Sequence, residues 1–360
     1  MTLAADVVIV GAGIAGAGLA AEIADEASVL LIEAEDQPGY HATGRSAAFW
    51  SESYGGPFVQ PLTSASRKFL EAEGLLRERR GLHLADQAGE AALAAMQAGL
   101  GGSVELHALG RGEIERLLPG VRPGWDHALL EPSCQDIDVA ALHALFLARV
   151  RRAGGRIVTG ARLLAAERRE GRWRLETKAG EMGAATLVDA AGAWADEVAR
   201  VAGAAPVALQ PCRRTIVQLR IEPPAPADLP LVIDASGRFY FKPEAGGRLW
   251  LSPHDETPCE PSDCAPEELD VALAIDRLEK VVDWRIERVE RSWAGLRTFA
   301  PDRRPVYGFA PDRPGFFWCA GQGGFGIQTA PAASRLAAAL LLERTPGIEP
   351  EPYLPGRFRN

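Results

Sequence analysis

Two short apolar runs lie close to the start of the chain, on either side of an alanine-rich segment. Residues 7–10 read VVIV and residues 29–32 read VLLI, whereas residues 13–25 are rich in alanine. A continuous apolar run of this length is typical of a parallel strand buried on both faces, and the alanine-rich segment favours a helix. The pattern therefore predicts a strand–helix–strand unit over residues 6–33.

Further along the chain, segments with the apolar spacing of helices alternate with segments whose apolar pattern is typical of strands. Longer segments with helical spacing predict helices over residues 64–80, 87–98, 136–153 and 270–282, with two more that end near residues 202 and 343. Residues 40–48 are expected to form a loop that enters a helix. Short apolar or alternating runs predict strands over residues 82–85, 156–159, 163–168, 173–177, 187–190, 214–221, 238–242, 249–252 and 316–320.

Composition and charge narrow the class of protein. Apolar residues make up 47% of the 360 residues and charged residues 24%, which is typical of a soluble globular protein. The net charge is −9 and the arginines are scattered, which argues against a nucleic-acid-binding face. Five cysteines without a CxxC pair argue against a metal site and a disulfide framework, and favour reduced thiols in the cytoplasm.

Targeting and membrane signals are weak in this sequence. The first residues lack the basic region of a signal peptide. Residues 314–334 carry no charge, but several glycines and Pro331 interrupt them, so they predict a strand, a loop and a helix start rather than a transmembrane helix. We therefore expect a cytoplasmic protein.

A glycine motif directly follows the first predicted strand. Residues 11–16 read GAGIAG, which fits GxGxxG, and Glu33 ends the next predicted strand 22 residues after Gly11. In this context the glycines allow a tight turn and close packing, the helix N-terminus faces a pyrophosphate, and the acid binds a ribose. The motif predicts a dinucleotide site and leaves open whether NAD or FAD binds there.

Four further segments appear in a consistent order: GYHATGRSAA at 39–48, AGAW at 191–194, WAGLR at 293–297 and QGGFGIQ at 322–328. Together with the glycine motif they resemble the D-amino-acid oxidase (DAO) family of FAD-dependent oxidoreductases, over residues 6 to about 340. Within it, the sequence is most similar to bacterial FAD-dependent D-amino-acid dehydrogenases of the D-arginine dehydrogenase type. Glycine and sarcosine oxidases resemble it less closely.

The resemblance implies an α/β fold of two discontinuous domains. The first would be a Rossmann-like FAD-binding domain of the glutathione-reductase type, formed by residues 1–80, 136–205 and 293–360. The second would be a substrate domain built on an antiparallel sheet, formed by residues 81–135 and 206–292. A chain of this length favours two domains.

The resemblance also implies which residues contact FAD. They are Gly11, Gly13, Ile14, Ala15, Gly16, Glu33, Ala34, Thr43, Gly44, Arg45, Ser46, Ala47, Ala191, Gly192, Trp194, Gly323, Gly324, Phe325, Gly326, Ile327 and Gln328. The residues themselves support the last group, because a glycine-rich loop between a strand and a helix lets a flat ligand approach the backbone. His41 lies beside this site, and we interpret it as a structural histidine.

At the substrate end, the resemblance implies that Arg214, Tyr240 and Arg297 bind a carboxylate and that Tyr54 forms a lid. A guanidinium offers a two-pronged donor to a carboxylate, which suits this role. Strand alternation places Tyr240 on the face opposite Phe239 and Phe241. Without the motif context, surface ion pairs for the arginines and a packed tyrosine would remain the alternatives.

Two departures from the D-arginine type concern the side-chain pocket. Phe49 stands where such relatives tend to have His, and Gly81 stands near the position of an acid that holds a cationic side chain; Arg79 and Arg80 precede it. We therefore expect neutral substrates, unless Glu52 or Glu244 replaces the acid. Residues 293–298 contain no cysteine for covalent attachment, and Cys319 lies on a predicted core strand, so FAD should bind non-covalently.

The predicted reaction is oxidative deamination of a D-amino acid, with hydride transfer from Cα to flavin N5, giving an imino acid and then a keto acid and ammonia. The electron acceptor would be O2 or a quinone. One alternative is a 2-hydroxy-acid dehydrogenase, which needs a base such as His41, His83 or His254. A glycine- or sarcosine-oxidase-like amine oxidase and a flavin-binding protein without turnover are the others.

Overall fold

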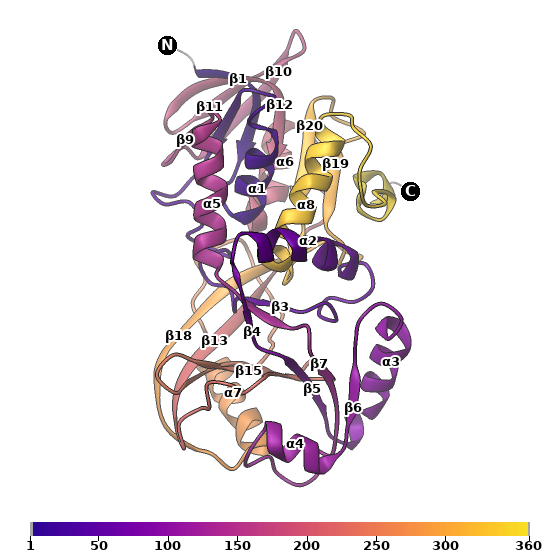
Figure 1. Ribbon diagram of the computed structural model, residues 1–360. Coiled ribbons are helices and arrows are strands. Elements are labelled where there is room, and N and C mark those ends of the chain that lie inside the picture. The colour runs from indigo at the N-terminus through magenta and orange to yellow at the C-terminus, as the bar shows by residue number, and fades with distance from the viewer. Residues whose placement is uncertain (1–2, 359–360) are drawn as a thin grey trace.

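The computed structural model describes residues 3–358, which form two large β-sheets with helices around them (Figure 1). The first sheet lies in the upper half of Figure 1 and the second in the lower half. Strands of the second sheet, β13 (Gln210–Glu222) and β18 (Arg285–Phe299), run up toward the first. These two strands therefore bring residues of the second sheet close to the first sheet.

The first sheet has a parallel centre. Its strands follow the order β10-β11-β12-β1-β2-β9, and β20 also pairs with β12 and β19 with β20. The pairs β1–β2, β1–β12, β2–β9 and β12–β20 are parallel. The bounds are β1 (Leu3–Val10), β2 (Val29–Ile32), β9 (Arg156–Val158), β10 (Leu163–Arg169), β11 (Arg172–Thr177), β12 (Gly180–Asp189), β19 (Val306–Phe309) and β20 (Phe316–Ala320).

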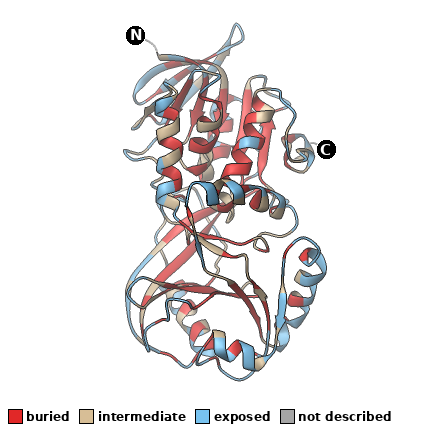
Figure 2. Ribbon diagram, viewed as in Figure 1, coloured by how far each residue is buried: buried red, intermediate tan, exposed pale blue. Residues whose placement is uncertain are grey.

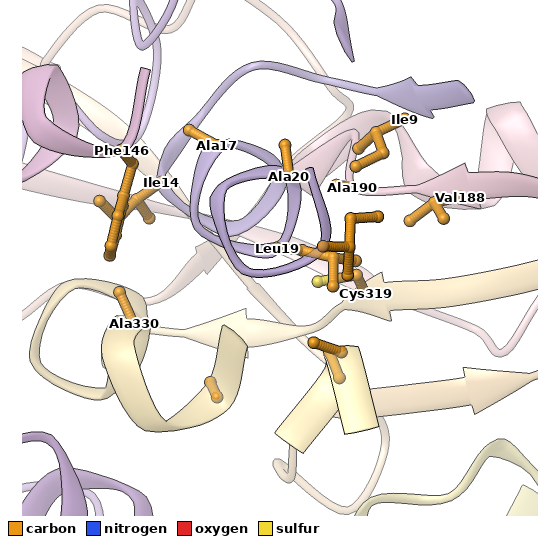
Figure 3. Close-up of a cluster of buried hydrophobic side chains, with 14 of the residues drawn as sticks. Ile9, Ile14, Ala17, Leu19, Ala20, Phe146, Val188, Ala190, Cys319 and Ala330 are labelled. Carbon is orange, nitrogen blue, oxygen red and sulfur yellow. The ribbon is translucent and has the colours of Figure 1, made fainter. Parts of the chain in front are cut away.

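Helices cover both faces of this sheet. One face packs against α1 (Ile14–Ile23), α5 (Val139–Arg152) and α8 (Gly326–Leu341), with α2 (Gln60–Ala72) alongside, and the other against α6 (Ala195–Ala202). Successive residues of β1 point to opposite faces of the sheet. Ile9 packs with α1 on one face, and Val8 packs with the cluster that contains α6 on the other. Figure 3 shows Leu19 and Ala20 of α1 beside Val188 and Cys319 of the sheet.

The second sheet is almost wholly antiparallel. Its order is β21-β18-β13-β16-β15-β14-β5-β7-β6, with β17 beside β13, and only β14–β5 is parallel. The remaining bounds are β5 (Gly81–Ala85), β6 (His107–Leu109), β7 (His127–Glu131), β14 (Leu231–Asp234), β15 (Tyr240–Glu244), β16 (Arg248–Ser252), β17 (Thr257–Pro258) and β21 (Gln322–Gly323).

The two faces of the second sheet differ in what they pack against. Phe239 and Phe241 face a core with α7 (Glu268–Val281) and α4 (Arg111–Leu117), whereas Tyr240 and Ile216 face a separate, smaller cluster on the other side. The predicted alternation along residues 239–241 is thus confirmed. Buried residues follow both sheets, whereas α4 and α3 (Glu90–Leu100) are largely exposed (Figure 2).

A third, three-stranded sheet joins β3 (Phe49–Trp50), β8 (Gln135–Ile137) and β4 (Leu76–Glu78). Two expectations are wrong here. The helix expected over residues 64–80 ends at Ala72, because Gly74 takes a φ of +67° and the chain continues into β4. Residues 40–48 are turns without a helix, since the amide of Gly44 bonds to the carbonyl oxygen of Gly39.

The predicted fold class is confirmed: a parallel sheet covered by helices is combined with an antiparallel sheet. Asp138 caps α5 by accepting a hydrogen bond from the amide of Ala141 at 2.9 Å. Between residues 3 and 358, no helix is both long and apolar enough to cross a lipid bilayer.

Candidate functional site

The glycine motif forms the turn between β1 and α1. Gly11 has a φ of +101°, and a Cβ atom there would lie 2.5 Å from the carbonyl oxygen of Ala190 at the end of β12. This position therefore requires glycine for both conformation and space. Gly13 directly precedes α1, whose first N–H groups have no partner within the helix.

His143 of α5 fixes the backbone of this turn by a hydrogen bond. Burial lowers its pKa, so the ring is neutral, and its Nε2–H donates to the carbonyl oxygen of Ala12 at 2.8 Å. The hydroxyl of Thr43 accepts a hydrogen bond from the amide of Ile14 at 2.9 Å. The loop 39–45 thus lies against the N-terminus of α1.

Glu33 stands at the end of β2, beside the same turn. Its carboxylate accepts hydrogen bonds from the amides of Ala12 at 2.9 Å and Glu35 at 3.0 Å. Each carboxylate oxygen keeps a further lone pair that can accept from a ribose hydroxyl. The acid is therefore placed where the motif predicts it.

A cavity of about 240 Å³, here called the long cavity, extends from Glu33 to the loop before α8. Most of the predicted cofactor residues line it: Gly11, Gly13, Ile14, Ala15, Glu33, Ala34, Thr43, Ser46, Ala191, Gly192, Trp194, Gly323, Gly324, Gly326 and Ile327. Its walls also include residues that were not among the predicted FAD contacts: Glu35, Gly39, Tyr40, His41, Ala161, Arg162, Leu163, Glu197, Val198, Val201, Leu296, Thr298 and Gln322.

The structure places other predicted cofactor residues away from the long cavity. Gly16 permits packing, because a Cβ atom there would lie 1.9 Å from the carbonyl oxygen of Gly11. Gly44 closes a turn, and Phe325 packs its ring against Tyr54 at 5.2 Å between ring centroids. The Arg45 side chain is largely buried and has protein partners instead: it pairs with Asp263 and donates to the carbonyl oxygens of Cys264 and Ala294, each at 3.1 Å.

A second, smaller space of about 20 Å³, here called the inner pocket, adjoins the long cavity. Ser46, Arg297, Gly324 and Ile327 line both spaces. The inner pocket brings together all four residues predicted at the substrate end: Arg214, Tyr240, Arg297 and Tyr54. Ala47, Ala48, Phe49 and Gln328 complete its lining.

The two arginines of the inner pocket differ in their partners. Arg214 is only 1% exposed, and it donates to the carbonyl oxygen of Asp255 at 2.8 Å, the hydroxyl of Tyr54 at 3.3 Å and the carboxylate of Glu256 at 3.0 Å. Arg297 is 7% exposed and donates to the carbonyl oxygen of Arg45 at 3.3 Å. Burial lowers the pKa of Arg297.

Of the two arginines in the inner pocket, Arg297 has no counter-ion among the described residues. Within residues 3–358, no carboxylate lies within 4.0 Å of its guanidinium nitrogens. Glu256 balances the charge of Arg214 and also pairs with Arg303 at 2.8 Å. A buried guanidinium without a paired carboxylate favours an anionic ligand, because an uncompensated buried charge is costly.

Tyr54, the predicted lid residue, lines the inner pocket from the segment after β3. Its ring packs edge-on against Phe49 at 5.0 Å, and its hydroxyl lies 3.0 Å from Nε2 of His254. The side-chain amide of Gln328 donates to the carbonyl oxygens of Ser51 at 3.2 Å and Tyr54 at 3.0 Å. Gln328 of α8 therefore holds the backbone of the segment 51–54.

The residues singled out for side-chain preference have separate positions. Phe49 lines the inner pocket. The sequence had also suggested its neighbour Trp50 as an aromatic wall of the substrate site, which is wrong: Trp50 is fully buried in the first core, where its indole N–H donates to the carbonyl oxygen of Thr63. Arg79 pairs with Asp136 at 2.7 Å, and Arg80 donates to the carbonyl oxygen of Asp228. Among the described residues, no acid lines the inner pocket.

The three histidines considered as candidate bases, His41, His83 and His254, lie in different places. His41 pairs with Glu35 at 3.0 Å and packs against Trp194 at the mouth of the long cavity. His83 is buried beside Ser53 and Glu131, and His254 lies behind Tyr54. The inner pocket has no histidine in its lining, as far as residues 3–358 show.

The donor set and the shape fit a bound FAD. A helix N-terminus and a glycine turn line the long cavity, together with the acid Glu33, which was predicted to bind a ribose, and backbone from the glycine-rich loop. Both spaces join at Arg297 and Gly324, so a substrate in the inner pocket would contact the far end of that ligand.

Solved structures share this fold over their whole length. Glycine oxidase from Geobacillus kaustophilus superposes with a TM-score of 0.87 at 23% identity, covering 100% of both chains. L-proline dehydrogenase from P. horikoshii gives a TM-score of 0.86 at 19% identity, covering 99% of this chain and 98% of the other.

Curated relatives match a part of their length. Glycine oxidase from Pseudomonas aeruginosa is 31% identical over 50% of this chain and 48% of its own length. Hydrogen cyanide synthase subunit HcnC from the same species is 27% identical over 70% of this chain and 60% of its own length. These relatives carry the names glycine oxidase, L-proline dehydrogenase and hydrogen cyanide synthase subunit, and none of the four is named as the D-arginine dehydrogenase type that the sequence was predicted to resemble most.

The sequence profile of the DAO family, described as FAD dependent oxidoreductase, matches residues 6–340. This range contains the glycine motif, the long cavity and all four residues of the substrate end. The chain therefore belongs to the DAO family of FAD-dependent oxidoreductases.

Proposed function

We propose that this chain oxidises the Cα–N bond of an α-amino acid with a neutral side chain, in the D-amino-acid dehydrogenase manner that its motifs imply. The observation that carries the proposal is the buried Arg297, which faces the inner pocket without a counter-ion. A substrate carboxylate would supply the missing negative charge and accept a forked hydrogen bond.

FAD would lie in the long cavity, with its phosphates at the turn 11–13, its adenosine ribose at Glu33 and its ring system at residues 323–327. When bound, FAD supplies the acceptor for the hydride that leaves Cα. Arg297 and Tyr240 hold the substrate from the opposite side, and Tyr54 covers it. Fixing the substrate against the cofactor is the main contribution of such side chains.

The amine must lose a proton before it is oxidised. Neither a carboxylate nor a histidine lines the inner pocket within the described residues, so we propose that this proton leaves to water. The same absence of an acid supports a neutral substrate, since a cationic side chain would be buried without a partner. Phe49 offers an apolar contact in its place.

A second candidate is a glycine- or sarcosine-oxidase-like activity. The inner pocket of about 20 Å³ holds little more than one water molecule, which favours a very small substrate while the lid is closed. A 2-hydroxy-acid dehydrogenase is less well supported. Burial lowers the pKa of His254 to about 3, which makes it a poor base for an alcohol, and Tyr54 stands between it and the pocket.

Anaerobic reduction of the purified flavoprotein tests the proposal. The panel contains glycine, sarcosine, both enantiomers of alanine, leucine and arginine, and the matching 2-hydroxy acids. We expect bleaching of the flavin by neutral amino acids, with the D-enantiomers ahead of the L-enantiomers. Bleaching by 2-hydroxy acids alone would replace the proposal by the hydroxy-acid alternative, and preference for glycine or sarcosine would favour the second candidate.

A further inference from the structure

The hydroxyl of Tyr54 has two protein partners at the edge of the inner pocket. Nη1 of Arg214 lies 3.3 Å from it, and Nε2 of His254 lies 3.0 Å from it. The other ring nitrogen of His254, Nδ1, lies 2.8 Å from the carbonyl oxygen of Gly237. These contacts form a chain from Gly237 through His254 and Tyr54 to Arg214.

The direction of each hydrogen bond in this chain is determined. A carbonyl oxygen only accepts, so Nδ1 of His254 carries the hydrogen. His254 is buried near three cations, Arg214, Arg277 and Arg303, and burial, followed by Arg214, lowers its pKa to about 3. The ring is therefore neutral, its Nε2 bears a lone pair, and the hydroxyl of Tyr54 must donate to it.

Arg214 determines how the lone pairs of the Tyr54 hydroxyl oxygen are used. A guanidinium only donates, so it uses one lone pair of the Tyr54 oxygen. The hydrogen already points to His254, which leaves one lone pair for a ligand. A Cβ atom added to Gly324 would lie 3.6 Å from this oxygen, so the absence of a side chain there keeps the hydroxyl accessible from the pocket lining.

We propose that His254 is a positioning residue that turns the lid hydroxyl of Tyr54 into a hydrogen-bond acceptor for the substrate's amine. A carboxylate also accepts, so it gains no hydrogen bond from this oxygen and goes to Arg297. The amine N–H goes to Tyr54. The pair thereby sets which way round the amino acid lies. This inference rests on the proposed function.

Two achiral ligands without a Cα hydrogen test the inference without turnover. 2-Aminoisobutyrate has both an amine and a carboxylate, and pivalate has a methyl group in place of the amine. Their Kd values are measured by perturbation of the flavin absorbance in the FAD-loaded protein. We expect wild type to bind 2-aminoisobutyrate about 3- to 10-fold more tightly than pivalate, as one added hydrogen bond gives.

Two matched substitutions separate the two nitrogens of the ring. In His254→Gln, the side-chain oxygen can stand near the place of Nε2 and accept from Tyr54, so the ratio of the two Kd values should persist. In His254→Asn, the amide can replace Nδ1 toward Gly237 but provides no acceptor near Tyr54, so the ratio should fall toward one. Bound FAD and the thermal unfolding midpoint establish that both variants are folded.

Tyr54→Phe completes a double-mutant cycle. If His254 acts through the hydroxyl, His254→Asn has no effect on the ratio once Tyr54 is Phe. Additive effects, or an unchanged ratio in His254→Asn, overturn the inference. Should one His254 variant not fold, the ratio in Tyr54→Phe decides, because an unchanged ratio there also overturns it.

The failures of the two proposals look different. If amino acids bleach the flavin but both ligands bind wild type equally, the role of His254 is wrong and the proposed function stands. If neither ligand binds and no amino acid bleaches the flavin, the proposed function fails and takes the inference with it.

Discussion

The side-chain nitrogen of Gln328, at the start of α8, lies 3.0 Å from the carbonyl oxygen of Tyr54. The same nitrogen lies 2.9 Å from the hydroxyl of Thr63 on α2. One amide thus connects the helix that follows the glycine-rich loop to the lid of the inner pocket. The segment predicted to form the lid is thus held by a buried polar contact from a distant part of the chain.

Gln328→Leu should loosen this lid. The carbonyl oxygens that lose their donor are buried, so the free energy of unfolding should fall by about 1–3 kcal/mol, and KM should rise more than kcat changes. Chemical denaturation and steady-state kinetics measure the two effects. Gln97→Leu, at an exposed position of α3, is the control. An unchanged KM in Gln328→Leu would show that the lid closes without this contact.

Arg297→Met should weaken carboxylate binding while FAD stays bound. Loss of a charge-assisted hydrogen bond costs about 1.5–3 kcal/mol, or roughly a 10- to 100-fold rise in the Kd for pivalate. Removal of an unpaired buried cation should not lower the stability of the ligand-free protein. Titration of the flavin absorbance provides the Kd.

Arg214→Met provides the comparison. Three protein groups already occupy its guanidinium, so we expect a smaller effect on pivalate than in Arg297→Met, together with a larger loss of stability. Equal losses of affinity in both variants would mean that the two arginines share the carboxylate.

Side-chain preference should follow Phe49. D-Leucine is expected to reduce the flavin with a higher kcat/KM than D-arginine, because the pocket offers an aromatic wall and no acid. Phe49→Asp should lower this ratio. A wild-type ratio below one would point to another acid. Glu52 is a poor candidate, since its carboxylate accepts from Ser64.

FAD should be released by acid or heat without proteolysis. Among the described residues, no cysteine lines the long cavity or the inner pocket, and Cys319 is 3% exposed within the first core. Absorbance of the supernatant after acid precipitation measures the released flavin. Yellow colour that stays in the pellet would indicate a covalent bond.

His254 should make stability depend on pH. Its folded pKa of about 3 lies below the ordinary value of 6.5, so between these values the unfolded chain binds a proton that the folded chain does not. Stability therefore falls as the pH drops below about 6.5. From about pH 7 to about pH 5, wild type should lose about 2 kcal/mol more than His254→Gln. Denaturant titrations at both pH values check this, and parallel losses in the two proteins would contradict it.

Local patterns were sufficient to predict much of the first sheet. Continuous apolar runs mark strands such as β1, β2 and β20, because both faces of a parallel strand are buried. The long strand β18 was not predicted as such. Its first half, from Arg285, is exposed and rich in charge, and only its pairing with β13 makes it a strand. Such pairing depends on residues far away in the sequence.

Site residues could be predicted from the sequence where they belong to a motif, but not elsewhere. The glycine turn, Glu33 and the four residues of the inner pocket lie together as the resemblance implies, although their roles remain predictions. The pairing of Arg45 with Asp263 was not predictable, since the two residues approach each other only in the folded chain. The division into two discontinuous domains also remains a prediction.

The ladder between β18 and β21 has a consequence for engineering this protein. Thr298 pairs with Gly323, and Phe299 with Gln322, so the backbone that lines the cavity is in register with the strand that carries Arg297. The spacing between these two walls is set by main-chain geometry. Library designs aimed at new substrates can therefore vary Phe49 and Ala47 in the pocket lining, whereas a one-residue insertion in either strand would misalign the pocket and cofactor walls together.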